Sequence, residues 1–510
     1  MSRVVVIGAG MGGLTAAARL AVKGHQVTVL ERSDAAGGKV GRFERDGFRF
    51  DTGPSLLTLP QVYRDFFNKT GRPIESALDI VELEPAFAYQ WADGARVVMP
   101  GADTSRCADA LGDGVGGRAA DDWRALMARA ADMWALTRQD FIESPLHGLR
   151  PLLRLAAKPG NIRTIAPLRS LRSLGEGMLR DPRLVTLLDR YATYTGSDPR
   201  RAPAALATIP YIEQTFGAHH IRGGIASLAS AVHDRAVERG VHVEFGTEVT
   251  RIETSGGRVV AVHTGAGRRL PAEVVVANAD ARTVLTQLLD TGAGRAAAAV
   301  RARQPSLAGF CIYAAVDADL PGIAHHNVWF CPDYDDEFDC VFGAGPSRGA
   351  QPVPDPTVYA CVPQDAAMAP AGSRAWFILI NAAPHGSDPG CVDWDAPGLA
   401  QDYAAQVLAR LAARGVDIRP HLRWMHVSTP ADLERRTGTP GGSIYGTASH
   451  GPRSAFTRPA NATPVAGLYL AGGSAHPGGG LPLVGMSGAI VAELIGRAAP
   501  TAGTSAPGAQ

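Results

Sequence analysis

The first 31 residues change from an apolar run to helical spacing and then to a second run. Residues 4–7 are all apolar, as in a strand buried on both faces. Leu14, Ala17 and Ala18 then repeat at the spacing of one helix face, and a second strand is predicted over residues 27–30. Strand, helix and strand in this order predict a parallel βαβ unit, and therefore an α/β fold.

A glycine pattern, G-x-G-x-x-G, joins the first strand to the helix. Gly8 permits a tight turn, Gly10 lets a pyrophosphate approach the backbone, and Gly13 brings helix and strand together. The free N–H groups at the start of the helix can bind phosphate, and Glu31, 18 residues beyond Gly13, can accept bonds from ribose hydroxyls. Because strands, helix and acid are in register, we interpret the pattern as a dinucleotide site rather than a structural glycine turn.

The residues after the second strand favour FAD over NAD. A glycine pair ending at Gly38 precedes Lys39 and Arg42, and the sequence FDTGP occupies residues 50–54. An extended cofactor that touches a third segment is typical of FAD, whose flavin lies far from its adenosine. Here the chain resembles the FAD-dependent amine oxidase and carotenoid desaturase superfamily, in which G-G-[RK] and F-D-x-G-P follow the ribose-binding acid. We expect Arg42, more than Lys39, to face phosphate or flavin; the alternative is a solvated charge.

The end of the chain carries a second glycine cluster, AGGSAHPGGG, at residues 471–480. A strand is predicted over residues 468–471 and a helix after Pro482. The resemblance implies that one flavin is held from both ends of the chain, and bare backbone lets a flat ring approach closely. Many relatives have an acid where this chain has Ser474. The residues predicted to bind FAD are Gly8, Gly10, Gly12, Gly13, Glu31, Arg32, Gly38, Lys39, Arg42, Gly53, Pro54, Gly472, Gly473, Ser474, Pro482 and Leu483.

The middle of the chain extends the resemblance. Residues 191–232 resemble the segment of bacterial carotenoid desaturases that reads F-A-T-Y-x-G and later G-G-x-x-x-L. A helix should follow Gly224, then a strand pair over residues 241–254 and a strand over residues 273–280. The block at residues 441–461 is more similar to hydroxycarotenoid 3,4-desaturases, because phytoene desaturases more often read G-S-A-F-G there.

The resemblance implies a flavin enzyme that removes two hydrogens beside a polyene, with the flavin accepting hydride. The favoured reaction is 3,4-desaturation of an acyclic carotenoid with a 1-hydroxyl or 1-methoxyl end; the alternative is phytoene desaturation. Two other classes share the fold, namely flavin amine oxidases and non-catalytic lipid carriers of the Rab-GDI sort. The electron acceptor would be oxygen or a quinone.

The motifs also predict the domains. A discontinuous Rossmann-type FAD-binding domain of the flavin amine oxidase-like superfamily is expected from residues 1–70, 218–290 and 450–500. Residues 71–217 and 291–449 would form an inserted substrate and membrane-associating domain of mixed sheet and helices. Residues 501–510 are small, polar and proline-containing, so we expect a disordered tail.

Composition narrows the partners. The 50 Lys and Arg residues nearly balance the 49 Asp and Glu residues, so no overall field attracts nucleic acid. Six cysteines without a C-x-x-C pair argue against a metal site or a disulfide framework and suit a reducing cytoplasm. Residues 460–492 lack charge, but their glycines and prolines argue against a spanning helix. We therefore expect a cytoplasmic protein without a transmembrane segment.

One stretch suggests peripheral attachment to a membrane. Residues 146–174 contain no acid and read as a basic, leucine-rich amphipathic stretch, which can lie on an anionic bilayer. The alternative is a solvated face above a core stripe. Its basic residues are Arg150, Arg154, Lys158, Arg163, Arg169 and Arg172, and its apolar residues are Leu149, Leu152, Leu153, Leu155, Ile162, Ile165, Leu168, Leu171 and Leu174.

Four polar residues are candidates for steering or proton transfer. Asp51, Glu213, His219 and His476 each lie in a motif segment expected near the flavin. Helix surface or turn capping is the alternative role for each of them.

Overall fold

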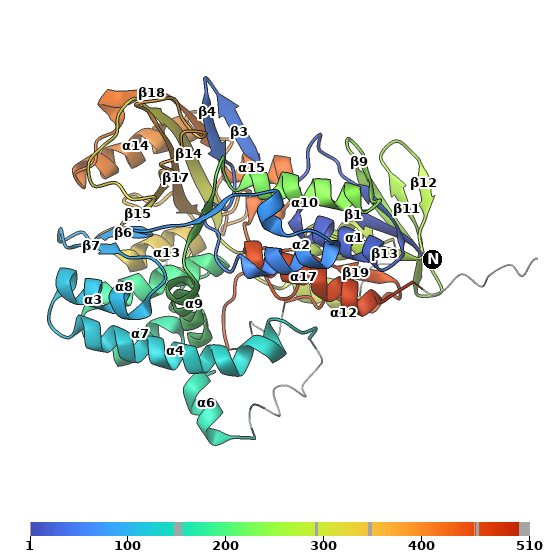
Figure 1. Ribbon diagram of the computed structural model, residues 1–510, viewed down its shortest axis with the longest axis horizontal. Helices are drawn as coiled ribbons and strands as arrows, with labels where there is room; N and C mark the ends of the chain where they lie inside the picture. Colours follow the sequence, from blue (N-terminus) through green and yellow to red (C-terminus); the bar gives the residue numbers. More distant parts are fainter. Residues whose placement is uncertain are drawn as a thin grey trace, which may run out of the picture.

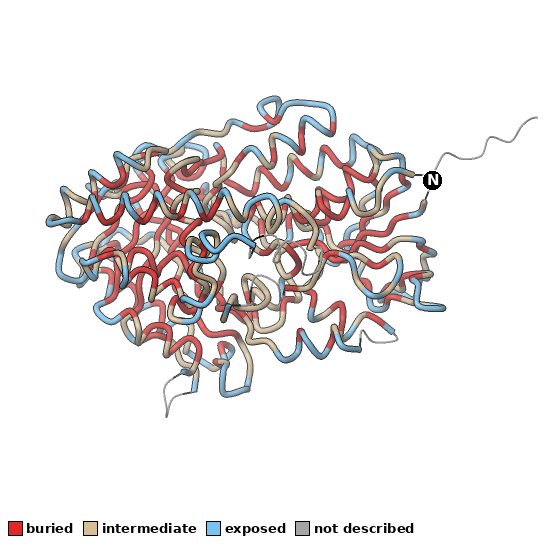
Figure 2. The backbone as a smooth tube through the Cα atoms, turned by 90° about the horizontal axis from the view of Figure 1, so that it is seen from below, coloured by how far each residue is buried: buried red, intermediate tan, exposed pale blue. Residues whose placement is uncertain are grey.

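The computed structural model describes residues 2–146, 155, 157–290, 294–344, 349–452, 454 and 458–498. Its two larger sheets lie in two lobes side by side (Figure 1). Buried backbone fills the left and right parts of the molecule, and much of the backbone between them is only intermediately buried (Figure 2).

The first lobe is built on a five-stranded parallel sheet whose strands come from both ends and the middle of the chain. Alternate residues face opposite sides, so that Val4 and Val6 join one core cluster, while Val5 and Ile7 join another. The strand order is β19 (Leu468–Leu470), β13 (Val274–Ala277), β1 (Arg3–Ile7), β2 (Gln26–Leu30) and β9 (His242–Glu244).

Helices cover one face of this sheet. A Cβ at Gly488 would overlap the Thr15 hydroxyl and lie 2.6 Å from the Gly12 carbonyl oxygen, so the first and last helices touch through glycine. These helices are α1 (Met11–Val22), α2 (Gln61–Thr70), α10 (Ala226–Glu238) and α17 (Leu481–Ile495).

The opposite face carries an antiparallel three-stranded sheet of β10 (Val249–Ser255), β11 (Arg258–Thr264) and β12 (Arg269–Pro271), with α11 (Ala281–Thr283), the π-helical turn η4 (Val284–Leu288) and α12 (Arg295–Arg301) beside it. The strand pair predicted over residues 241–254 is therefore wrong as a pair. β9 pairs with β2 and β10 with β11, because each strand finds its partner elsewhere in the chain.

The second lobe contains a seven-stranded sheet. All neighbours are antiparallel except the parallel pair of β15 and β6. One face packs on α14 (Leu399–Ala413), and the other meets the hairpin of β3 (Arg42–Arg45) and β4 (Phe48–Asp51). The order is β18 (Leu422–Ser428), β14 (Ala308–Val316), β17 (Arg374–Ala382), β16 (Val358–Cys361), β15 (His326–Trp329), β6 (Phe87–Gln90) and β7 (Arg96–Met99).

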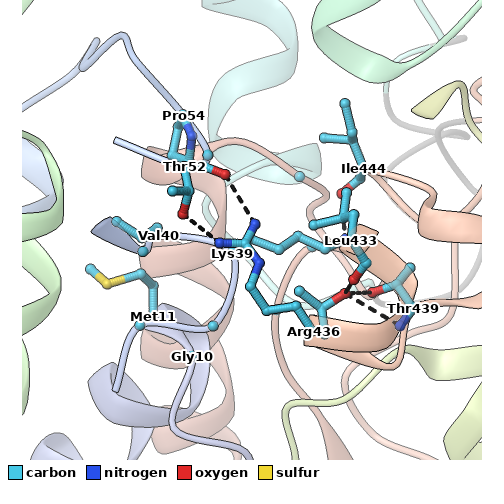
Figure 3. Close-up of a pocket in the computed structure, with 18 of the residues that line it drawn as sticks. Gly10, Met11, Lys39, Val40, Thr52, Pro54, Leu433, Arg436, Thr439 and Ile444 are labelled. Carbon is cyan, nitrogen blue, oxygen red and sulfur yellow. Dashed lines mark hydrogen bonds between the residues drawn. The ribbon is translucent and has the colours of Figure 1, made fainter. Parts of the chain in front are cut away.

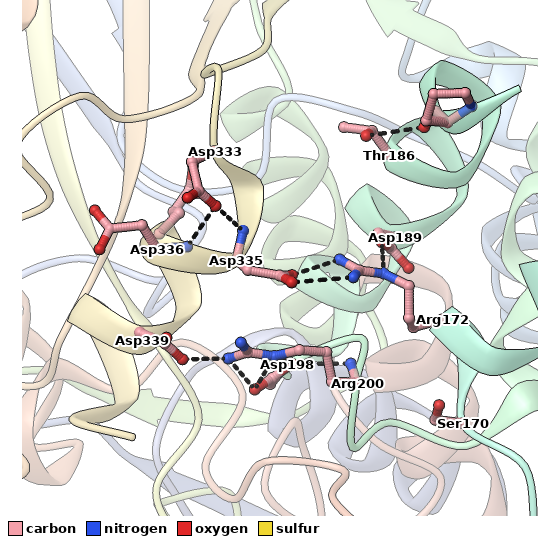
Figure 4. A network of polar contacts seen from close by, with 12 residues as sticks. Ser170, Arg172, Thr186, Asp189, Asp198, Arg200, Asp333, Asp335, Asp336 and Asp339 are labelled. Atoms are coloured by element: carbon pink, nitrogen blue, oxygen red, sulfur yellow. Dashed lines mark hydrogen bonds and ion pairs between the residues drawn. The ribbon is translucent and has the colours of Figure 1, made fainter. Parts of the chain in front are cut away.

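Helices extend this lobe. They are α3 (Thr104–Val115), α4 (Ala119–Phe141), α6 (Pro159–Ile165), α7 (Leu171–Met178), α8 (Pro182–Arg190) and α9 (Thr208–Phe216), with the short turns η2 (Tyr191–Thr195) and η3 (Ala204–Ala207). Arg172 pairs with Asp189 and, at 2.7 Å, with Asp335 of α13 (Tyr334–Phe342), as Figure 4 shows. These ion pairs tie α7 to α8 and to α13.

The remaining elements connect the lobes. β5 (Ile80–Glu82) pairs with β8 (His219–Ile221), and α15 (Pro430–Thr437) leads to the short turn η6 (Pro440–Gly442); η1 (Ile74–Ser76) and η5 (Arg419–His421) are single turns. None of the helices in the described ranges has the length and apolar character needed to cross a membrane.

Candidate cofactor and substrate site

A cavity of about 970 Å³ lies between the two larger sheets. Its wall combines the glycine turns near both ends of the chain with aromatic residues of the second lobe. We call the part formed by Gly8, Gly10, Glu31, Gly472 and Gly473 the glycine end. The part formed by Arg190, Tyr194, Tyr334, Tyr359 and Phe377 is the aromatic end.

The first glycine turn is packed against Asn278, directly after β13. A Cβ at Gly8 would lie 2.9 Å from the Asn278 carbonyl oxygen, and Gly8 has a φ of +93°. A Cβ at Gly10 would lie 2.6 Å from Asn278 Nδ2. Gly12 and Gly13 are not on the cavity wall: a Cβ there would crowd the backbone of Gly472 or of Gly8. Their role in this structure is close packing.

Glu31 lies on the wall of the glycine end, where its carboxylate is fixed by main chain. Oε2 accepts a bond from Ala9 N at 2.7 Å, and Oε1 accepts bonds from Ser33 N at 2.9 Å and Ser33 Oγ at 2.7 Å. Carboxylate oxygens accept more than one bond each, so capacity remains for hydroxyl donors in the cavity. Arg32, beside it, is exposed and donates to the Arg435 carbonyl at 2.8 Å.

Lys39 and Arg42 both line the cavity but differ in setting. Lys39 Nζ donates to the carbonyls of Ser443 at 2.9 Å and Ile444 at 2.7 Å. Burial lowers the pKa of Lys39 to about 8, although the carboxylate of Asp280 opposes the shift. Arg42 is partly exposed and donates to Ser227 Oγ at 3.0 Å. The deeper cation is therefore Lys39, in contrast to the preference for Arg42 drawn from the sequence.

Arg436 of α15 adds a cation that sequence reasoning missed. Its guanidinium reaches across the cavity wall to Thr52 and donates to the Thr52 carbonyl at 3.0 Å (Figure 3). Gly53 and Pro54 line the cavity next to this contact, and so does Gly38 on the preceding turn.

The second glycine cluster contains two kinds of glycine. Gly472 has a φ of +98°, and a Cβ there would lie 2.6 Å from Asn278 Oδ1, so the protein itself requires glycine. Gly473 has no such need: a Cβ would come no closer than 3.4 Å to a protein atom, and the residue lines the cavity. Its bare backbone is what a flat cofactor lying on the main chain needs.

The other residues of this cluster that are predicted to bind FAD also differ from one another in their placement. Ser474 lines the cavity, but its Oγ accepts a bond from Ala281 N at 2.8 Å. Pro482 lies on the cavity wall and Leu483 does not.

None of the four residues predicted for steering or proton transfer lines this cavity. Asp51 accepts bonds from Ile225 N and Ala226 N, both at 2.8 Å, and so caps the start of α10; burial raises its pKa. His219 lies in β8, and burial lowers its pKa. His476 is buried, its Nε2 lies 2.9 Å from the Ser144 carbonyl, and burial lowers its pKa.

Glu213 lies behind the aromatic end rather than on its wall. It accepts bonds from the hydroxyls of Tyr191 at 2.6 Å and Tyr194 at 2.8 Å, and burial raises its pKa. The four residues share a motif neighbourhood with the cavity, but proximity along the chain did not reveal which way each side chain points.

Comparison with known proteins agrees with this arrangement. The family described as flavin containing amine oxidoreductase matches residues 11–318. The 4,4'-diapolycopene oxygenase of Methylomonas sp is 33% identical over 505 residues, which cover 97% of this chain and 98% of that protein. The chain belongs to the flavin-containing amine oxidoreductase family. The predicted resemblance to carotenoid desaturases is also confirmed, since the hydroxyneurosporene desaturase of Cereibacter sphaeroides is 32% identical, with 97% of each chain covered.

Solved structures of two amine oxidases share the fold. A putrescine oxidase variant superposes with a TM-score of 0.64 at 17% identity, covering 97% of this chain and 98% of that one. Cyclohexylamine oxidase from Brevibacterium oxydans superposes with a TM-score of 0.61 at 16% identity, covering 97% and 99%. The predicted α/β fold with a Rossmann-type FAD domain is confirmed, and the protein is an FAD-dependent oxidoreductase.

The residues present in this flavin-containing oxidoreductase fit FAD. Gly473 leaves bare backbone on the cavity wall that packing does not demand, Glu31 keeps acceptor capacity for ribose, and Lys39 supplies a cation. The aromatic end was not foreseen. Residues 191–232 form a motif segment in the sequence, but side chains such as Tyr194 line the cavity only because distant elements surround them.

Proposed function

We propose that this oxidoreductase desaturates an acyclic carotenoid at the 3,4 position next to a 1-hydroxyl or 1-methoxyl end. The observation that carries the proposal is one continuous cavity from the glycine end to the aromatic end. A cavity that adds apolar and aromatic side chains to the glycine turns suits a polyene. Relatives support the finer choice: the 1-hydroxycarotenoid 3,4-desaturase of Flavobacterium sp. is 30% identical over 97% of this chain.

In the block at residues 441–461, which favours the hydroxycarotenoid branch, Ile444 and Tyr445 line the cavity. Tyr445 is part of the wall, and Arg458 donates to the carbonyls of Tyr445 at 3.0 Å and Gly473 at 2.9 Å. The segment that differs between the branches is therefore tied to the glycine cluster that faces the cofactor.

The residues of the chain bind the cofactor, align the substrate with it and enclose both. Bound FAD supplies the hydride acceptor for desaturation. Lys39 and the bare Gly473 backbone hold the cofactor side of the cavity, while Val328, Phe377 and Leu379 give the substrate side an apolar wall that excludes water.

Pigment analysis tests the reaction. With a 1-hydroxylated carotenoid as substrate, absorption should shift to longer wavelength and the product mass should fall by the mass of two hydrogens. Either oxygen or a quinone is supplied as electron acceptor, in separate reactions. Phytoene should react much less, and its efficient conversion would favour the alternative that a 32% identical phytoene dehydrogenase of Streptomyces griseus represents. A gain of oxygen without desaturation would contradict both.

We also propose that the surface around α6 attaches the enzyme to membrane. This helix protrudes from the lower edge of the molecule (Figure 1). Leu168 is 88% exposed and Ile162 is 38% exposed, with the exposed cations Lys158, Arg163 and Arg169 nearby. Exposed apolar side chains among cations suit the headgroup region of an anionic bilayer.

The other residues of the basic stretch fall into three groups. Arg172 is engaged by Asp189 and Asp335, and Ile165, Leu171 and Leu174 are core residues, so these four do not contribute an outer face. Leu155 is intermediate in exposure. Leu149, Arg150, Leu152, Leu153 and Arg154 lie outside the described residues.

Sedimentation with anionic liposomes tests attachment. Replacing Lys158, Arg163 and Arg169 by Gln should weaken binding by about 1 kcal/mol per charge. Ile162→Ser with Leu168→Ser should weaken it further. Val237→Ser, which changes an exposed apolar residue of α10, should leave sedimentation unchanged. Equal sedimentation of all variants would show that α6 is an ordinary solvated surface.

A further inference from the structure

A buried arginine sits at the aromatic end of the cavity. Arg190, the last residue of α8, is only 6% exposed and lines the cavity. Its guanidinium carbon lies between 5.2 and 5.8 Å from five ring centroids, a distance at which cation and ring attract. The rings belong to Phe87, Tyr89, Tyr191, Tyr194 and Tyr359.

The hydrogen-bonding capacity of Arg190 is largely unused. Within the described residues its guanidinium makes one hydrogen bond, from Nη1 to the Tyr194 hydroxyl at 3.2 Å, and forms no ion pair. A guanidinium carries five N–H donors, all in its plane, whereas aromatic rings contact its faces. Because Arg190 lines the cavity, its remaining donors can be satisfied by a molecule held there.

The charge of Arg190 is balanced without direct contact. Glu213 accepts bonds from the hydroxyls of Tyr191 and Tyr194, and Tyr194 in turn accepts the bond from Arg190. The carboxylate therefore neutralises the cation across the tyrosine hydroxyls. A neutral pair with free N–H donors is suited to a neutral acceptor, such as an alcohol or ether oxygen, rather than to a second carboxylate.

The free-energy cost of burying Arg190 also indicates a ligand in the cavity. A buried cation with unfilled donors is expensive, and an apolar residue would give a polyene a better wall. We propose that Arg190, held by Tyr194, is the subsite for the oxygen of the substrate's end group and so fixes which bond of the polyene reaches the cofactor. This rests on the proposed function for the polyene itself.

Binding to the FAD-loaded enzyme tests the subsite apart from turnover. Hydroxyneurosporene, neurosporene and a polyene of equal length with a terminal carboxylate are titrated, with quenching of protein fluorescence as the signal. Wild type should bind the hydroxylated compound roughly tenfold to a hundredfold more tightly than the hydrocarbon, the effect of a hydrogen bond to a charged group. Arg190→Met should bind the two alike, and Tyr194→Phe should lose part of the preference.

A second buried arginine provides the control. Arg235 of α10 lies 5.6 Å from the Phe67 ring, pairs with Glu238 and does not line the cavity. Arg235→Met removes a buried cation from a ring without touching the subsite, so it should keep the wild-type preference. Flavin absorbance shows whether each variant retains FAD. If Arg190→Met loses FAD, Tyr194→Phe is the variant that tests the subsite.

The outcomes separate the two proposals. Bound hydroxyneurosporene without a desaturated product would contradict the proposed function while leaving the preference ratio as a measure of the subsite. Three results would each overturn the subsite: no preference in wild type, a preference that survives in Arg190→Met, or tightest binding of the carboxylate. Where Arg190→Met loses FAD, an undiminished preference in Tyr194→Phe would overturn it instead.

Discussion

The two ends of the cavity are built from different material. At the glycine end, most of the wall is main chain: turns after β1 and β19 approach each other around Asn278, and a Cβ at Gly8, Gly10 or Gly472 would lie less than 3 Å from that residue. At the aromatic end, the wall is side chains from α8, β16 and β17 around a buried cation. The glycine turns come from short motifs that can be identified in a sequence. The aromatic wall is assembled from side chains of distant elements and cannot be identified in this way.

The two ends should also differ in which substitutions they tolerate. At the glycine end, a Cβ at Gly8, Gly10 or Gly472 would meet the main chain or the side-chain amide of Asn278, which is packed among these turns. A change at the aromatic end disturbs a hydrogen-bonded network, whose cost depends on how many partners lose their bonds. The four experiments below address this difference, beginning with the largest expected effect.

Glu213→Leu should destabilise the protein most, by about 3 to 5 kcal/mol, because it leaves Arg190 without its balancing charge. It also removes the acceptor of two buried tyrosine hydroxyls. Urea denaturation followed by tryptophan fluorescence measures the loss. Glu213→Gln, which keeps one acceptor oxygen, should lose less. FAD per folded protein should not change in either variant, and loss of flavin at full stability would contradict the separation of the two ends.

The sequence predicted the glycine end well for a local reason. β1, β2 and β19 begin and end within one residue of the predicted strands, and α17 begins one residue before Pro482. Apolar runs and glycines carry this information over a few positions. Lys39, by contrast, becomes the deep cation only because carbonyls more than 400 positions away, at Ser443 and Ile444, surround it.

The same reason explains the errors. Asp51 and His476 lie next to correctly identified motifs, but their partners, Ile225 and Ser144, come from elsewhere in the chain and turn them from the cavity. The sequence places Arg172 among surface cations because its acidic partners, Asp189 and Asp335, lie outside the basic stretch. The predicted domain boundaries stay a prediction.

Glu31→Ala should weaken FAD binding by roughly 1.5 to 3 kcal/mol, the range for a hydrogen bond to a charged group. Ala9 N and Ser33 also lose their acceptor, so the turn itself loosens. Titration of apoprotein with FAD gives the dissociation constant, and Glu31→Gln should show a smaller loss. A dissociation constant equal to that of wild type would place Glu31 away from the cofactor.

A matched pair of glycine substitutions separates packing from cofactor contact. Gly13→Ala would drive a Cβ into the Gly8 carbonyl oxygen and should cost about 1 to 3 kcal/mol of apoprotein stability. Gly473→Ala meets no protein atom closer than 3.4 Å and should leave that stability within about 0.5 kcal/mol while weakening FAD binding. Denaturant unfolding of both apoproteins measures the stability, and titration with FAD measures the affinity. If Gly473→Ala binds FAD as wild type does, the bare backbone there is not for the cofactor.

The smallest effect comes from Lys39, the deeper of the two cations that the N-terminal motif places on the cavity wall. Lys39 has a pKa of about 8 in the cofactor-free protein, lowered by burial and by Arg436 but raised by Asp280. The pyrophosphate of FAD is negative and stabilises the protonated amine, so binding takes up a proton once the pH exceeds 8. Affinity should therefore be constant below pH 7 and fall about tenfold, or 1.36 kcal/mol, by pH 9.

Two substitutions at Lys39 test that sign. Lys39→Gln has no proton to take up and should bind FAD more weakly below pH 8, with the slope between pH 7 and 9 abolished. Lys39→Arg stays charged across this range and should also show no slope, but with affinity nearer that of wild type at pH 7. FAD titrations at each pH supply the dissociation constants. A slope that persists in Lys39→Gln would assign the proton to another group and leave the glycine end with backbone and Glu31 as its means of holding the cofactor.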